Sequence, residues 1–239
     1  MNIVTAHRPA NPGNTRARRS LRVPLTGKNM SLALVREHSD ERSELESGIS
    51  RKFASTYGAE LSHFLPNLLR LKVSDELGAV VGIREASEGS LFLEQYLDAP
   101  IEQSIARAFK TPVDRDQIIE IGNLAANVPG FAYALFAVLA TVLNRAGYRW
   151  VACTATPQVA AMLARMGFSS KNICSADPTR LDNGSDAWGQ YYATRPRVIA
   201  GDVRSAAAKV AENPEMAALM RQLAQPIAQM VASLKKATS

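Results

Sequence analysis

The pattern of hydrophobic and polar positions is clearest between residues 118 and 168, where it predicts a strand, a loop, a helix, a strand and a second helix. Residues 118–126, IIEIGNLAA, are apolar around a single acid, Glu120. Residues 131–145 are almost uncharged, have helical length and end before Gly147, a residue suited to the left-handed position that closes a helix. A β-rich run, 148–156, precedes a helix that starts at Pro157. A helix that joins two such strands is the unit of a parallel or mixed α/β sheet.

The flanking segments have weaker patterns. They predict a strand at 31–37, a helix capped by Asp40 and stopped by Gly58, a hairpin at 65–86 that turns at 75–78, a helix at 100–109, and β-like pieces at 172–177 and 188–201.

The chain ends in an amphipathic stretch that begins at Pro214, and Pro226 is expected to kink or split this helix. Its apolar stripe is Met216, Leu219, Met220, Leu223, Ile227, Met230, Val231 and Leu234. The stripe is consistent with a helix packed on its own domain or on a neighbouring subunit of a homodimer. It is also consistent with a methionine-rich surface for a partner or a membrane.

The net charge of +6 lies in one part of the chain. Residues 1–28 contain six basic residues and no acid, so the remainder carries 28 − 6 = 22 basic residues against 22 acidic ones. We therefore expect a disordered basic arm at 1–28 joined to a nearly neutral folded part, and nucleic-acid binding is not favoured. Contact of the arm with RNA or with an anionic membrane stays open as an alternative.

Cysteine and histidine usage predicts neither a disulfide framework nor a metal site. Cys153 and Cys174 are too few for the first, and His7, His38 and His63 lack paired spacing for the second. The N-terminus has no apolar signal segment, so a cytoplasmic protein is expected. Residues 131–143 are too short to span a membrane, which needs about 20 residues.

Four motifs together resemble the thermostable hemolysin family over about residues 57–201. They are LFLEQYLDAPIE at 91–102, IIEIGNLAA at 118–126, ACTAT at 152–156 and WGQYYATRPRVIAG at 188–201. The resemblance implies a GNAT-like acyltransferase fold, with a central mixed twisted sheet flanked by helices. The expected parts are the arm, a GNAT-like domain at 29–201 and a helical extension at 202–239. More loosely, Glu120 followed by Asn123 is similar to acyl-homoserine-lactone synthases, which have Glu and Arg there and use S-adenosylmethionine with an acyl carrier.

The resemblance implies acyl transfer from a thioester to a small amine, a reaction that needs a base, oxyanion donors and an acid for the leaving thiolate. Glu120, on the predicted central strand, is the candidate base, although a carboxyl group there can instead be held by backbone donors or an arginine. Glu94 is a second candidate, with a salt bridge as the alternative. Tyr191 and Tyr192 are candidate acids or packing residues. As neighbours on an expected strand they would face opposite ways, and Tyr192 is preferred.

The loop from Asn127 to Gly130 resembles the phosphate-binding loop of GNAT enzymes, with backbone N–H groups at a helix start. It has one glycine, no arginine, and a proline without an N–H group, so the donor is expected to be either acyl-CoA or an acyl-carrier-protein thioester. Expected donor-binding residues are Asn123, Leu124, Ala125, Asn127, Gly130, Phe131 and Thr154. The alternatives are a membrane-active protein that acts through its C-terminal helix without catalysis, an S-adenosylmethionine-using synthase, and a ligand sensor.

Overall fold

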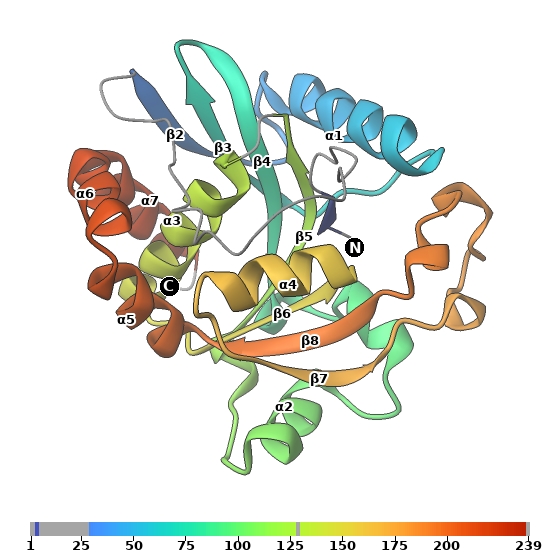
Figure 1. Ribbon diagram of the computed structural model, residues 1–239. Coiled ribbons are helices and arrows are strands. Elements are labelled where there is room, and N and C mark those ends of the chain that lie inside the picture. The colour runs from blue at the N-terminus through green and yellow to red at the C-terminus, as the bar shows by residue number, and fades with distance from the viewer. Residues whose placement is uncertain (1–2, 5–28, 128–129, 238–239) are drawn as a thin grey trace, which may run out of the picture.

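The strands predicted from the hydrophobic pattern lie in one mixed sheet (Figure 1) of order β2-β3-β4-β5-β6-β8-β7. The computed structural model describes residues 3–4, 29–127 and 130–237. The strands are β1 Ile3–Val4, β2 Met30–Val35, β3 Asn67–Val73, β4 Glu76–Glu85, β5 Ile118–Ala126, β6 Trp150–Ala155, β7 Ser170–Ser175 and β8 Arg197–Asp202. Strands β5 and β6 are parallel, and β1 pairs in parallel with β5 outside the main order.

The helices match the predicted order. They are α1 Arg42–Tyr57, α2 Ile101–Phe109, α3 Phe131–Ala146, α4 Pro157–Arg165, α5 Val203–Glu212, α6 Pro214–Gln222 and α7 Ala224–Ala237. The prediction for the central segment is confirmed, because α3 joins the parallel strands β5 and β6 and ends at Gly147 with a φ of 101°.

Side chains of β5 alternate between two hydrophobic cores. Ile119 and Ile121 belong to the core under α3, which also takes side chains from α4, α5, α6 and α7. Ile118 belongs to the core under α1 and α2. We call the two sides of the sheet the α3 face and the α1 face. Every residue of β5 is buried, because helices cover both of its faces.

The C-terminal helices pack against α3, and Figure 1 shows α5, α6 and α7 gathered beside it. The predicted split is confirmed, but the break falls at Leu223 and Pro226 lies in the first turn of α7. Proline is tolerated there because the first N–H groups of a helix have no intrahelical acceptor. Seven of the eight stripe residues are buried in the α3-face core and Val231 packs against it, so the stripe is not a free surface in this fold. In the described ranges, no helix is long and apolar enough to cross a membrane.

Two local predictions are wrong. Asp40 does not cap α1, whose N-cap position is Glu41 with no side-chain cap, and Glu41 is paired with Arg70 of β3 instead. The β-like piece at 188–201 is a strand only in its second half, because Gly189 and Arg195 have positive φ angles of 50° and 55° and turn the chain.

The remaining expectations about the chain termini are tested only in part. The expectation of a disordered arm concerns residues 1–28, of which 1–2 and 5–28 lie outside the described residues. Ile3–Val4 is described and forms a strand, contrary to that expectation.

Candidate functional site

Strand β5 carries a bulge immediately after the point where it stops pairing with β6. The parallel ladder runs from Ile118 to Ile121 of β5, which is opposite Cys153 of β6. On the other edge, Gly122 faces Gly82 of β4 but Ala125 faces Val80, so two residues of β5 oppose one residue of β4. Such a bulge kinks a strand and redirects its side chains. We call the position where β5 and β6 cease to pair the ladder end.

Asn123 supplies the unusual backbone conformation of the bulge. Its φ is 50°, a left-handed value that asparagine tolerates better than most residues. The bulge also shifts the alternation of side chains, since Ile121 and Leu124 both join the α3-face core although they are three residues apart. Beyond the ladder end, the backbone of Leu124 and Ala125 is not paired with β6.

Two buried polar atoms at the ladder end have no hydrogen-bond partner within the described part of the chain. The Oδ1 of Asn123 accepts from the backbone N–H of Leu65 at 2.9 Å, but its Nδ2 is unpaired. The Oγ1 of Thr154 on β6 is also unpaired, and both residues are fully buried. An unpaired buried polar group costs about 1–3 kcal/mol, so such atoms are rare in folded proteins unless a ligand or water pairs with them.

Glu120 is fully buried on the α1 face, next to the ladder end. Its Oε2 and Oε1 accept the backbone N–H groups of Phe92 and Leu93, each at 3.0 Å. These N–H groups open the 3₁₀ helix Phe92–Tyr96, so the carboxylate fixes the LFLEQYLD segment to the central strand. A carboxylate has about four acceptor positions, and these two contacts leave capacity for others.

Glu94 forms an ion pair with Arg115. Its Oε1 and Oε2 lie 2.7 and 2.8 Å from the guanidinium of Arg115, and they also accept the backbone N–H groups of Leu91 and Ile101. Burial alone would raise the pKa of Glu94, but the hydrogen bonds from Arg115, Ile101 and Leu91 outweigh it and lower the pKa to about 2. Glu94 therefore has the salt bridge that the sequence left open as an alternative.

This ion pair predicts a defined acid sensitivity. The folded-state pKa of Glu94 lies below its ordinary value of 4.5, so the pair stabilises the fold above about pH 4.5 and loses that effect as the pH falls toward 2. The unfolding temperature of the wild type should exceed that of Glu94→Gln at pH 7, and the gap should close between pH 4.5 and 2. Thermal unfolding followed by circular dichroism measures the gap, and a gap independent of pH would contradict the prediction.

An aromatic cluster covers the α1 face beside Glu120. The rings of Tyr191 and Tyr192 are 5.3 Å apart, and Trp188 lies 5.8 and 6.1 Å from them. The Tyr192 hydroxyl is hydrogen-bonded to the Tyr96 hydroxyl at 2.5 Å, and the buried Tyr191 hydroxyl donates to the backbone oxygen of Thr154 at 3.4 Å. The two neighbouring tyrosines are therefore not strand residues facing opposite ways, because the segment is built of 3₁₀ turns.

The loop before α3 is described only at its ends, since Val128 and Pro129 lie outside the described residues. Asn127 donates from Nδ2 to the backbone oxygen of Leu77 at 3.0 Å. Gly130 has a φ of 96° and occupies the N-cap position of α3, where a glycine offers no side-chain acceptor to the first N–H groups of this helix. The Phe131 side chain is buried in the α3-face core and is only 6% exposed, which leaves its backbone as the part suited to ligand contact.

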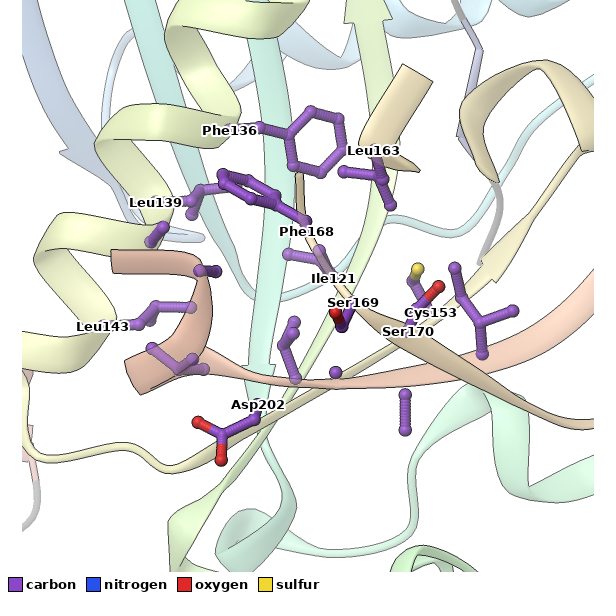
Figure 2. Close-up of a pocket in the computed structure, with 17 residues that line it drawn as sticks. Ile121, Phe136, Leu139, Leu143, Cys153, Leu163, Phe168, Ser169, Ser170 and Asp202 are labelled. Atoms are coloured by element: carbon purple, nitrogen blue, oxygen red, sulfur yellow. The ribbon is translucent and has the colours of Figure 1, made fainter. Parts of the chain in front are cut away.

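A small apolar cavity adjoins the ladder end on the α3 face (Figure 2). Its volume is about 60 Å³, and it is lined by Ile121 and Cys153 at the ladder end together with Phe136, Leu139, Leu163 and Phe168. Burial raises the pKa of the Cys153 thiol to about 12, so this sulfur stays protonated at neutral pH and is a poor nucleophile. Within the described ranges, no group of three or more His, Cys, Asp or Glu residues is placed to hold a metal ion.

The structure thus gathers Glu120, Asn123, Leu124, Ala125 and Thr154 around the ladder end. Tyr192 belongs to the aromatic cluster on the α1 face, Asn127, Gly130 and Phe131 follow β5, and Glu94 is tied to Arg115.

Two participants were missed from the sequence. Tyr96 lies 96 positions from its partner Tyr192, and Arg115 lies 21 positions from Glu94. The sequence carries no local signal for either pairing, although Tyr96 and Tyr192 both lie in family motifs, at 91–102 and 188–201.

Comparison with solved structures shows the fold. The AHL synthase LasI is 13% identical with a TM-score of 0.52, over 74% of this chain and 92% of LasI. FeeM, an N-acyl amino acid synthase from uncultured soil microbes, is 12% identical with a TM-score of 0.52, over 77% of this chain and 95% of FeeM. TofI in its apo form is 14% identical with a TM-score of 0.52, over 79% of this chain and 99% of TofI. The fold is thus the GNAT-like fold that the sequence resemblance implied.

Sequence comparison gives the family. No curated protein matches the chain. The family model described as Thermostable hemolysin matches residues 35–207, which contain the bulged strand, Glu120 and the aromatic cluster. The chain belongs to the thermostable hemolysin family.

Proposed function

We propose that this protein transfers an acyl group from a thioester donor to a small amine. The observation that carries the proposal is the ladder end, where two unpaired buried polar atoms, Asn123 Nδ2 and Thr154 Oγ1, flank a bulged strand beside the buried Glu120. The GNAT-like fold, shared with the AHL synthase LasI and the N-acyl amino acid synthase FeeM, supports the same reaction class. The donor is an acyl-CoA or an acyl-carrier-protein thioester.

The donor would lie along β5 beyond the bulge. Its pantetheine arm has amide groups that can pair with the backbone of Leu124 and Ala125 as a strand would. Its phosphates would lie near Asn127 and the N–H groups at the start of α3, where the helix dipole favours negative charge. The acyl end would enter the apolar cavity at Ile121 and Cys153. At about 60 Å³ this cavity is far smaller than the ~300–1,000 Å³ of a whole small-molecule site, so it suits a short acyl chain.

The reaction assigns one role to each group. The amine nitrogen attacks the thioester carbonyl and gives up a proton to Glu120, and the Asn123 Nδ2–H and Thr154 hydroxyl stabilise the tetrahedral oxyanion. The C–S bond then breaks, and Tyr192 protonates the leaving thiolate, so an amide and a free thiol result. Exchange with water then removes the proton from Glu120 and returns one to Tyr192. Cys153 takes no part, because its buried thiol stays protonated at neutral pH.

Glu94 has a positioning role in this proposal. A carboxylate with a pKa of about 2 is a weak base at neutral pH, and its contacts with Arg115 and with the N–H of Ile101 join the 3₁₀ helix to α2. The segment that donates to Glu120 is held in place in this way.

The tyrosine pair offers a matched test. Tyr192→Phe removes the proposed acid, whereas Tyr96→Phe removes the same hydroxyl–hydroxyl hydrogen bond but keeps the Tyr192 hydroxyl. Because a positioned acid contributes about 10²–10⁴-fold to rate, Tyr192→Phe should lower kcat by about 100-fold or more. Tyr96→Phe should lower it only a few-fold. Thiol release from butanoyl-CoA in the presence of an amine measures both, and equal losses would contradict the assignment of Tyr192.

A further inference from the structure

The ladder end holds a piece of the chain that the proposed reaction does not use. Strand β1 pairs in parallel with β5, Ile3 opposite Leu124 and Val4 opposite Ala125. These two residues of β5 come immediately after Asn123, the left-handed residue of the bulge, and beyond the last β5–β6 pair, Ile121 with Cys153. In Figure 1, β1 lies beside β5 close to the point marked N.

Strand β1 and the donor arm require the same hydrogen-bonding groups. The opposite edge of β5 is taken by β4, which pairs with Ala125 and Ala126 through Val80 and Ala79. Only the edge toward β6 remains for a pantetheine arm, and β6 has separated from β5 there. A strand and an extended amide chain cannot both pair with one edge of Leu124 and Ala125.

We propose that strand β1 is a built-in competitor of the acyl donor, so that residues 3–4 must leave β5 before the donor can bind. This inference rests on the proposed function, since it specifies how the same site is regulated. Only the backbone pairing of Ile3 and Val4 with Leu124 and Ala125 is needed for this competition, and the side chains of Ile3 and Val4 have no role in it.

The short length of β1 makes it displaceable. A two-residue strand forms few hydrogen bonds, and each contributes only about 0.5–1.5 kcal/mol net. When the binding-competent state is a minor one, the apparent Kd of a ligand rises by the inverse of its population. If β1 is docked in about nine molecules of ten, releasing it should tighten donor binding about tenfold.

The test compares two double variants in the full-length chain. Ile3→Pro/Val4→Pro removes both backbone N–H groups of β1 and prevents strand pairing. Ile3→Val/Val4→Ile keeps both N–H groups and the β-branched character, and so serves as the control. Hydrogen exchange of the β5 amides at 124–126 reports whether β1 is docked, and calorimetric titration with butanoyl-CoA reports donor affinity. Unfolding temperatures check that both variants keep the fold.

The expected result is faster exchange at 124–126 and about tenfold tighter butanoyl-CoA binding in the proline variant, with the control unchanged. Added butanoyl-CoA should slow exchange at 124–126 again in the proline variant. Unchanged exchange would show that β1 does not dock on β5, and faster exchange without a gain in affinity would show that it does not compete. Either result would overturn the inference and leave the proposed function to the tyrosine test. Absence of butanoyl-CoA and butanoyl-carrier-protein binding in every chain would count against the proposed function itself.

Discussion

Replacing Glu120 by glutamine is expected to lower both the stability of the protein and its turnover. The carboxylate accepts two backbone N–H groups, from Phe92 and Leu93, at 3.0 Å each. A glutamine amide has one oxygen, so its NH₂ group must face one of these donors. An unpaired buried donor costs about 1–3 kcal/mol, and loss of a general base costs about 10²–10⁴-fold in rate.

Urea unfolding and amine-dependent thiol release measure these two losses separately. Glu102→Gln is the control, because Glu102 is only partly buried and pairs with Arg115 at 2.8 Å in a salt bridge near the surface. It should cost at most about 1 kcal/mol and leave turnover within a few-fold of wild type. If Glu120→Gln behaves like this control in both measurements, Glu120 neither anchors the 3₁₀ helix nor acts as the base.

Replacing Gly189 by alanine is expected to be the most damaging single substitution for the fold. An added Cβ would lie 2.2 Å from the backbone oxygen of Tyr57 and 2.8 Å from the backbone of Gly58, and φ at Gly189 is +50°. Backbone strain and overpacking each cost about 1–3 kcal/mol, so a loss of roughly 2–6 kcal/mol is expected. The overlap would also disturb the bond from the N–H of Gln190 to Tyr57, which docks the aromatic cluster on the end of α1.

Gly184→Ala separates crowding from conformational strain. Gly184 also has a positive φ, +69°, but nothing lies within 4 Å of an added Cβ. Only the left-handed backbone then costs energy, about 1–2 kcal/mol. Urea unfolding should therefore rank the variants as wild type, Gly184→Ala and Gly189→Ala in decreasing stability. Similar losses for the two glycines would show that the segment at 188–190 does not pack against α1 as described.

The hydrophobic pattern is sufficient to predict a helix or strand where consecutive residues alone define that element. Three elements are predictable from consecutive residues alone. They are the apolar strand β5, the almost uncharged helix α3 that ends at Gly147, and helix α4, which starts at a proline. The late segment was mispredicted because Trp188 and Tyr191 look like strand residues, whereas their conformation depends on Gly189 fitting against Tyr57, far away in the sequence.

The candidate site was predictable in composition but not in geometry. Glu120 and Asn123 stand out as polar residues in an apolar strand. The bulge that turns Asn123 toward Leu65 depends on pairing with β4, and the Glu94–Arg115 ion pair joins separate loops. These are tertiary contacts, and the chain carries no periodic signal for them. The pairing of β1 with β5 joins positions about 120 residues apart and is likewise a tertiary contact without a periodic signal in the sequence.

The central claim, acyl transfer at the ladder end, is tested most directly by incubating the full chain with butanoyl-CoA or butanoyl-carrier protein and a panel of small amines. The panel includes amino acids and S-adenosylmethionine, and mass spectrometry measures the amide product. The Ile3→Pro/Val4→Pro chain is assayed in parallel, so that a docked β1 does not conceal activity. With at least one amine of the panel, we predict that one amide forms for each thiol released. In the Tyr192→Phe variant, we predict that amide formation is almost completely lost. If the wild type and the Ile3→Pro/Val4→Pro variant are both folded and neither forms an amide from either donor, acyl transfer at the ladder end is contradicted.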